Sequence, residues 1–465
     1  MSFCTINAIP FLEKNQNPNQ IIMKKITTTI AILCGVFAAI AQTNPVITDW
    51  LQNTTNIMGR HYINGNSTPV NDNVLANVQS VEYSASWVYV SATGIPAYIT
   101  GPFLDGNPSL ASDQNAIYQF PLIPSQNTGA ATATTGGNIG VFINGVSLFD
   151  YRDGVSWNST TNSLCGGPGN PPCPGGPMAA RDWNRDAIPA EMGGFDCAKA
   201  HPAMGNYHHH QNPSAFDLDL IVVSNICSTY PADGLYVIDQ NSHSPLIGFA
   251  YDGYPIYGAY AFTNTNGTGA VTRMKSSYQL NTAATRTNGP AVNATYINGY
   301  FREDYRYVAN TAADYLDEHN GRFAITPEYP NGTYAYYATV DANHNSAYPY
   351  VVGPTYYGNV VGGDVASISE TTTPYVLSNE SVAALDAITI YPNPSQDFIA
   401  IQSTLSPLDL KVAVYNSLGQ LVLKEHILQG STLSVLDTTA LYNGVYFVKI
   451  SNDANTVTHK VILDR

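Results

Sequence analysis

The chain has 465 residues, enough for two or more domains, and its hydrophobic fraction of 44% is typical of a folded protein. Its 19 basic and 34 acidic residues leave a net charge of −15, without a basic stripe, so we expect no nucleic-acid partner. The 32 tyrosines, 37 glycines and 29 prolines, with only 11% charged residues, predict a β-rich extracellular protein of short strands and many turns.

Residues 23–41 have the pattern of an export signal. Two lysines precede an apolar run that ends at Ile40, and we expect cleavage after Ala41. Because the run is well short of the ~20 residues that span a bilayer, no transmembrane anchor is expected after signal cleavage. Residues 1–22 are interpreted as an extension from a mis-assigned start codon, the alternative being an extended first region of the signal.

Signal cleavage leaves four cysteines, an even number in an oxidising compartment, so two disulfides are expected. Three pairings are open. We favour Cys165 with Cys173, across a Gly/Pro-rich loop, and therefore Cys197 with Cys227. In the alternative, Cys197 is a thiolate ligand, which ranks lower because a free thiol beside a partner cysteine oxidises outside the cell.

Strand-like patterns begin after a polar lead-in over residues 42–62. Alternating Val, Tyr and Trp predict strands in residues 81–99 and 116–123. Residues 137–150 predict a hairpin that turns at Asn144-Gly145, because Asn-Gly between two apolar runs is a strong short-range turn signal.

The histidine stretch FDCAKAHPAMGNYHHHQNP, residues 195–213, holds four of the ten histidines. If its second half is extended, His208 and His210 share one face, while His209 points the other way. Residues 202–206 contain Pro, Gly and Asn, which favour a turn that would bring His201 beside the pair. The sequence therefore predicts three imidazoles gathered by one hairpin.

A longer apolar run, FDLDLIVVSNIC in residues 216–227, predicts a buried strand. In residues 244–260 an apolar run precedes Asp252-Gly253, which is turn chemistry. Residues 263–299 are polar and are expected to form an exposed excursion.

Metal binding is one reading of His201, His208 and His210, because imidazole suits copper and zinc and a three-histidine set leaves positions open. The competing reading is a hydrogen-bonded histidine cluster without a ligand. A further ligand could come from His319. Glu318 and Asp252 are the candidate catalytic carboxylates, Glu318 as a general base on metal-bound water.

The last eighty or so residues change to short alternating strands, which predict a small β-sandwich. YPNP, YNSLGQLV and LYNGVYFVKI followed by THKVIL resemble the type A sorting domain of the type IX secretion system of Bacteroidetes. The resemblance implies an Ig-like sandwich and an interaction of residues 388–465 with the type IX machinery. It also implies export through the periplasm to the outer surface or the medium.

Residues from about 78 to 358 resemble the YHYH domain family, named for a Tyr-His-Tyr-His motif. The resemblance rests on GNIGVFINGV, AHPAMGNYHHHQNP, LIGFAYDGYPIYGAY, LDEHNGRFAITPEYPNGTYAYYATV and YPYVVGPTYYG in that order. His209 replaces the middle tyrosine of the motif, and a second motif position reads Tyr-Ala-Tyr-Tyr in residues 334–337 without histidine. The resemblance implies a fold and a site but supplies no reaction.

We thus expect a mainly β protein, with a large β-rich YHYH-like domain followed by a small Ig-like β-sandwich. Its function is expected to be binding of a divalent metal, copper or zinc, with metal-dependent chemistry as an open question. The alternative is a non-enzymatic surface module for glycans or proteins with structural histidines. The expected segments are residues 1–22, the signal peptide 23–41, the YHYH-like domain 42–362, a linker 363–387 and the sorting domain 388–465.

Overall fold

Short strands joined by turns dominate the computed structural model, as the tyrosine- and glycine-rich composition predicts. The structure describes residues 44–106, 109–167, 169–176, 181–282, 285–376, 388–403, 410–417, 419–427, 433–451 and 456–465. The predicted signal peptide and the segment before it lie outside these residues. The chain divides into unit 1, Met1–Tyr375, and unit 2, Val376–Arg465.

Unit 1 is built on an eight-stranded mixed sheet. Its strands, in spatial order, are β13 (Ala200–Ala203), β14 (Asn206–His209), β9 (Ser147–Phe149), β8 (Asn138–Phe142), β15 (Leu246–Ala250), β16 (Pro255–Tyr257), β22 (Thr333–Tyr337) and β21 (Gly321–Ala324). All five residues of β15 are buried, because this central strand is covered on both faces. The predicted Asn144-Gly145 turn joins β8 to β9, with Gly145 at φ +80°.

A five-stranded antiparallel sheet packs on the large sheet. Its order is β24 (Gly363–Asp364), β6 (Ala116–Pro121), β4 (Trp87–Ala92), β3 (Val78–Tyr83) and β25 (Thr373–Tyr375). Val88 and Phe120 from this sheet share a core with Phe249 of β15. The short helix α2 (Pro45–Thr48) and Trp50 are buried in the same core, so the segment predicted as a polar lead-in is an integral part of the domain.

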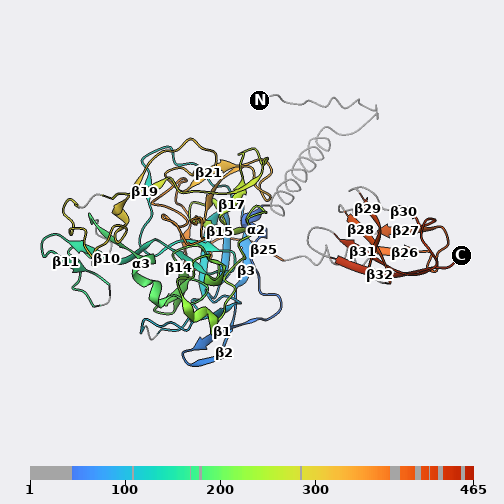
Figure 1. Cartoon of the computed structure of the whole chain (residues 1–465), viewed down its shortest axis with the longest axis horizontal. Coiled ribbons are helices and arrows are strands. Elements are labelled where there is room, and N and C mark those ends of the chain that lie inside the picture. Colours follow the sequence, from blue (N-terminus) through green and yellow to red (C-terminus); the bar gives the residue numbers. More distant parts are fainter. Residues whose placement is uncertain are drawn as a thin grey trace, which may run out of the picture. The chain divides into compact units, whose positions relative to one another are not determined.

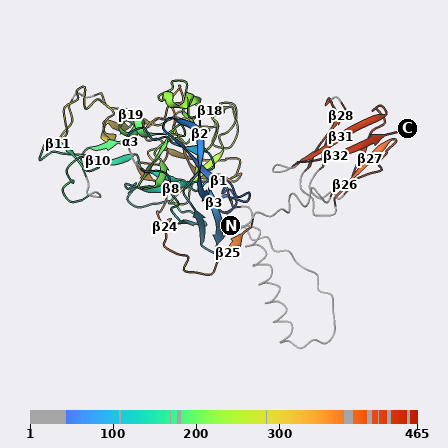
Figure 2. The same cartoon turned by 90° about the horizontal axis from the view of Figure 1, so that it is seen from below.

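Smaller sheets complete unit 1. They are β2 (Asn66–Leu75), β1 (Met58–Ile63) and β5 (Ile99–Thr100); β11 (Ser163–Cys165), β10 (Arg152–Asn158) and β12 (Asn184–Asp186); and the pairs β17 (Tyr260–Phe262) with β18 (Val271–Arg273), β19 (Tyr278–Leu280) with β20 (Tyr305–Tyr307), and β23 (Thr355–Tyr356) with β7 (Thr132–Ala133). The helix α3 (Ala187–Glu191) lies between β10 and β14 (Figure 1). Strands β10 and β11 occupy one end of the unit in both views (Figure 2).

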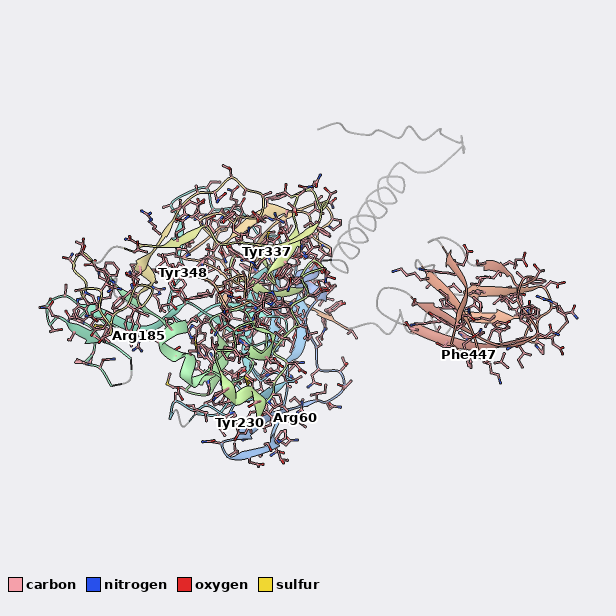
Figure 3. The ribbon with its side chains drawn as sticks, viewed as in Figure 1. Arg60, Arg185, Tyr230, Tyr337, Tyr348 and Phe447 are labelled. Carbon is pink, nitrogen blue, oxygen red and sulfur yellow. A yellow bond between two sulfur atoms is a disulfide. The ribbon has the colours of Figure 1, made fainter. Side chains whose placement is uncertain are left out.

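A tyrosine-rich core covers the second face of the large sheet. Tyr336 of β22 and Tyr348 are both buried there. Figure 3 shows Tyr348, and the buried Tyr337 of the other core, among the packed side chains of unit 1. Much of the tyrosine content is therefore structural.

Unit 2 is a small β-sandwich of the predicted kind. One sheet contains β26 (Ile388–Tyr391), β27 (Phe398–Ser403) and β30 (Leu433–Asp437), and the other β29 (Leu421–Ile427), β28 (Leu410–Asn416), β31 (Gly444–Ser451) and β32 (Thr456–Leu463). Ile399 and Ile401 from the first sheet share one core with Val412 and Val448 from the second.

Two predicted segments differ in the structure. The predicted linker begins too early, because β24 and β25 fall inside it and form the two edges of the five-stranded sheet.

The strand predicted for residues 216–227 is also wrong. Two single turns of 3-10 helix, Phe216–Leu218 and Asn225–Ser228, flank residues 220–223, whose aliphatic side chains are exposed. An apolar run without periodicity does not establish burial, and here a disulfide loop holds it at the surface.

Both disulfides have the pairing that the sequence favours. Cys165 is bonded to Cys173, and Cys197 to Cys227. The second bond ties the start of the histidine stretch to the loop that follows it. With its sulfur in a disulfide, Cys197 is not available as a thiolate ligand.

Candidate metal centre

The three predicted histidines meet on the β13–β14 hairpin at the edge of the large sheet. His201 lies opposite His208 in the antiparallel register. The turn between the strands is Met204-Gly205, and both residues have positive φ, +50° and +91°, as a two-residue type I′ turn requires. The predicted fold-back of the chain therefore occurs.

One ligand atom from each of His201, His208 and His210 lies within 4.8 Å of the other two, and all three residues are buried. The Nε2 atoms of His208 and His210 are 3.1 Å apart. His209 points to the other face, where its ring nitrogens contact the Tyr98 hydroxyl at 2.8 Å and the Lys199 carbonyl at 3.3 Å. The alternation expected of an extended strand thus separates His209 from the cluster.

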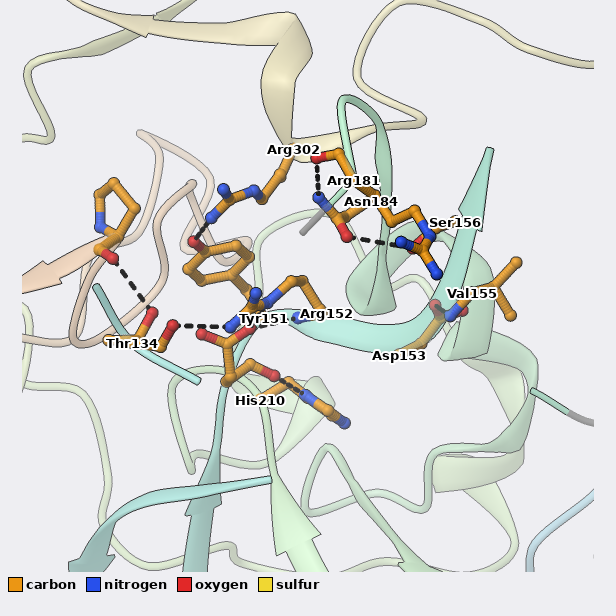
Figure 4. A network of polar contacts seen from close by, with 12 residues as sticks. Thr134, Tyr151, Arg152, Asp153, Val155, Ser156, Arg181, Asn184, His210 and Arg302 are labelled. Atoms are coloured by element: carbon orange, nitrogen blue, oxygen red, sulfur yellow. Dashed lines mark hydrogen bonds and ion pairs between the residues drawn. The ribbon is translucent and has the colours of Figure 1, made fainter. Parts of the chain in front are cut away.

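Backbone carbonyls fix the orientation of two imidazoles. His208 Nδ1 lies 2.9 Å from the Asn206 carbonyl oxygen, and His210 Nδ1 lies 2.6 Å from that of Asp150, a contact drawn beside Tyr151 and Arg152 (Figure 4). A carbonyl oxygen only accepts, so each Nδ1 carries the proton and donates it. The two Nε2 atoms then face each other, and their lone pairs require either a shared proton or a cation between them.

Glu191 joins the histidines, and the sequence did not predict it. Its Oε2 atom lies 3.3 Å from Nε2 of both His201 and His210. It ends α3, whose first turn is capped by Asp186 accepting a hydrogen bond from the Ile188 backbone N–H at 2.9 Å. The only signal in the sequence is its position ten residues before His201.

Three of the separations between these atoms match those of metal ligands. A tetrahedral ion with bonds of 2.0–2.1 Å holds its ligand atoms about 3.3 Å apart. The measured separations are 3.1 Å for His208 to His210 and 3.3 Å for Glu191 to each of His201 and His210. His201 Nδ1 is buried without a hydrogen-bond partner among the described residues. Such an uncompensated polar atom fits a site shaped for an additional charged group.

The electrostatics keep His208 and Glu191 in the forms that bind metals and favour a proton on His210, which a metal would displace. Burial, followed by the nearby His210 and His201, lowers the pKa of His208 well below its usual value, so its imidazole is neutral at neutral pH. Burial also acts against a charged His210, but Glu191 outweighs it and raises the pKa of His210. Burial acts to raise the pKa of Glu191, but His201 and His210 outweigh burial and hold this pKa well below its usual range. A carboxylate and a neutral imidazole are the forms that bind metals.

Aromatic rings enclose the cluster. Phe149 stacks on His208 with ring centroids 3.7 Å apart, and Phe195 meets His201 edge-on at 5.0 Å. The side chain of His210 is 3% exposed and that of Glu191 is 23% exposed. Solvent therefore reaches the cluster from the side of Glu191.

A buried carboxylate holds the base of the hairpin in place. Asp196 accepts hydrogen bonds from the backbone N–H groups of Gly101, Ala198 and Ala200 and from the hydroxyl of Tyr207. Burial raises its pKa to about 7. The segment from Asp196 to the first strand is thus fixed by local contacts independently of the histidines.

The group formed by His201, His208 and His210 does not include Asp252, Glu318 or His319, and the carboxylate in contact with it is that of Glu191. Asp252 is buried in a turn, where it accepts hydrogen bonds from the Tyr336 hydroxyl at 2.5 Å and the Gly358 N–H at 2.8 Å. The Glu318 side chain is 56% exposed. His319 Nδ1 contacts the Thr355 hydroxyl at 2.7 Å.

Residues 117–349, half of the chain, match the model of the YHYH protein family. The chain belongs to the YHYH family. The histidine hairpin, α3 and Glu191 all fall inside the matched region of this YHYH protein. No curated protein sequence matches it.

Residues 389–464 match the secretion system C-terminal sorting domain, here of the type IX system. The YHYH protein is therefore recognised by the type IX secretion machinery and exported to the cell surface or secreted. The match falls on unit 2, the small sandwich. Within the described part of the chain, no helix combines the length and apolar character needed to cross a membrane.

Proposed function

We propose that the exported YHYH protein binds one divalent transition metal, zinc or copper, through His201, His208 and His210, with Glu191 as the fourth group. The observation that carries the proposal is the pair of Nε2 atoms 3.1 Å apart, each on a ring whose Nδ1 is bonded to a backbone carbonyl. Preorganised rings of this kind are typical of metal-binding histidines.

Zinc is the metal that the ligand set suits best. Three imidazoles and one carboxylate are common zinc ligands, and separations of 3.1 and 3.3 Å match a tetrahedral arrangement. Copper(II) binds the same ligand types but prefers a flatter, tetragonal arrangement. When zinc and copper compete, we therefore expect the protein to bind a higher ratio of zinc to copper than an unstructured histidine peptide binds under the same conditions.

Glu191 determines what such a site does. As a fourth protein ligand it closes the site, which is the arrangement of structural or storage zinc. If Glu191 remains beside the ion, the fourth position is open to water and the carboxylate is placed as a general base, which supports hydrolytic chemistry. The side of the cluster that is open to solvent is the Glu191 side, with the glutamate side chain 23% exposed.

The test is the metal content of the purified full chain after incubation with zinc and copper and removal of unbound ions. We expect wild type to retain one ion and the double variant His208→Ala plus His210→Ala to retain none. His209→Ala is the matched control, because it removes a histidine from the same strand but from the opposite face. His243→Ala, on another segment, replaces this control if the buried substitution prevents folding.

Equal and negligible metal in wild type and in the double variant would overturn the proposal. The histidines would then be structural, and a non-enzymatic surface module for glycans or proteins would become the leading function. Binding of glycans that survives the double substitution would support that alternative directly.

A further inference from the structure

A lysine and an aspartate are paired inside unit 1, away from solvent. Lys199 Nζ lies 2.6 Å from Asp219 Oδ1, and the two side chains are 0% and 2% exposed. Among the described residues this is the one lysine–carboxylate pair with both partners buried. Lys275 and Asp314 are also 2.6 Å apart, but their side chains are 35% and 20% exposed.

Local structure holds the two partners in contact. Lys199 has φ +66°, and its backbone N–H donates to the Asp196 carbonyl at 3.0 Å, which turns the side chain at the base of the histidine hairpin. Asp219 follows the 3-10 turn Phe216–Leu218, and the Phe216 N–H donates to the Cys197 carbonyl at 2.9 Å. The Cys197–Cys227 disulfide closes the loop that contains both residues.

The Lys199 ammonium group has two hydrogen-bond acceptors in contact and an aromatic ring nearby. An ammonium group has three donors, and Lys199 Nζ donates to Asp219 Oδ1 at 2.6 Å and to Ser214 Oγ at 3.2 Å. The Phe216 ring lies 5.5 Å from Nζ. Removing two charges from water is expensive unless every donor and acceptor is satisfied, so a neutral bond between the same groups would be favoured over the ion pair.

We infer that Lys199 and Asp219 form an intramolecular isopeptide bond. A proton first passes from the Lys199 ammonium group to the Asp219 carboxylate; the neutral Nζ then attacks Cγ of Asp219, a C–N bond forms, and one C–O bond breaks. The departing oxygen takes two protons from the ammonium group and leaves as water, so the reaction converts –NH₃⁺ and –COO⁻ into –NH–CO– and H₂O without change of net charge. Ser214 Oγ, 3.2 Å from Nζ, is placed to relay a proton.

The close contact between the two groups accelerates the reaction. Groups held in contact in a fixed orientation react with effective molarities far above any solution concentration, and no oxidant, cofactor or activated ester is required here. A desolvated lysine is also a better nucleophile than one in water. The amide would form a second covalent closure inside the disulfide loop, one that reducing agents leave intact. The inference is independent of metal binding.

The test is proteolysis of the full chain after denaturation and reduction. Trypsin cleaves after free lysine but not after an acylated one. We expect cleavage after Lys275, which is the matched exposed control, and none after Lys199. A second digestion at acidic residues should then yield a branched peptide that joins Lys199 to Asp219 and is lighter than the sum of its parts by one water molecule.

Two variants complete the experiment. Lys199→Arg keeps the positive charge without an amine nucleophile, and Asp219→Ala removes the acceptor carbon. We expect both to restore tryptic cleavage at position 199 and to give peptides of unmodified mass. Cleavage of wild type after Lys199 to the same extent as after Lys275, with an Asp219 peptide of unmodified mass, would overturn the inference. Wild type alone decides this, so the result does not depend on the folding of the variants.

Discussion

Replacing Glu191 with glutamine tests whether this carboxylate contributes to zinc binding. The substitution keeps the shape of the side chain but removes the charge that lies 3.3 Å from Nε2 of both His201 and His210. Groups beside a bound metal contribute about 10- to 100-fold to its affinity. We therefore expect Glu191→Gln to weaken zinc binding by about 1.4–2.7 kcal/mol.

That loss can be converted to a change in melting temperature. At free zinc a thousandfold above its dissociation constant, binding stabilises the wild-type fold by about 4 kcal/mol. Unit 1, with roughly 330 described residues, unfolds with an entropy of about 0.7 kcal/mol per degree. Zinc should therefore raise the wild-type Tm by about 6 °C, and the rise in Glu191→Gln should be smaller by about 2–4 °C at the same free zinc.

Differential scanning fluorimetry at buffered free zinc measures both quantities. The readout is the zinc-induced rise and not the absolute Tm, because the substitution also changes the metal-free protein. Glu318→Gln is the matched control: it makes the same chemical change on a side chain that is 56% exposed, and we expect a wild-type response. An unchanged zinc-induced rise in Glu191→Gln would refute its role as a ligand, and the absence of any rise in wild type would refute the site.

Three further predictions concern stability. Gly205→Ala should destabilise the fold by about 1–3 kcal/mol in urea unfolding, because φ is +91° and a Cβ would lie 2.1 Å from Ser112 Oγ; a neutral effect would contradict the turn geometry. Replacing Cys165 and Cys173 with serine should lower the unfolding free energy by about 2.5 kcal/mol, the loop-closure value for a separation of 8 residues. Burial raises the pKa of Asp252 from 3.8 to about 6, so its stabilising contribution is complete below pH 4 and is lost as the pH rises through 6. Asp252→Asn should therefore gain stability relative to wild type between pH 4 and pH 7, and a parallel pH dependence of the two proteins would contradict the raised pKa.

The histidine cluster could be predicted because its information is local. Alternation along a strand places His208 and His210 on one face, and turn-forming residues return His201 to them. Glu191 could not be predicted in the same way. Its carboxylate reaches the cluster only because α3 packs against β10 and β12, and no short pattern encodes a contact between a helix end and a sheet edge.

The fold shows the same division between local and long-range information. Period-two patterns located β3, β4 and β6, and Asn144-Gly145 located a hairpin. The exposed residues 220–223 and the strands β24 and β25 were missed, because burial and edge pairing depend on partners that are distant in the chain. The pairing of β25 with β3, for example, joins Thr373 to Tyr83.

The three histidines of the proposed site lie close together along the chain, which bears on how the site would form during folding. Ten residues contain His201, His208 and His210, so bringing them together closes only a small loop and loses little chain entropy. By contrast, the parallel pairing of β14 with β9 joins His208 to Ser147 and must wait for a long intervening segment to be arranged. With an ion in the proposed site, the hairpin could close around it before the large sheet is complete, and the supply of that ion would then affect the order in which the sheet assembles.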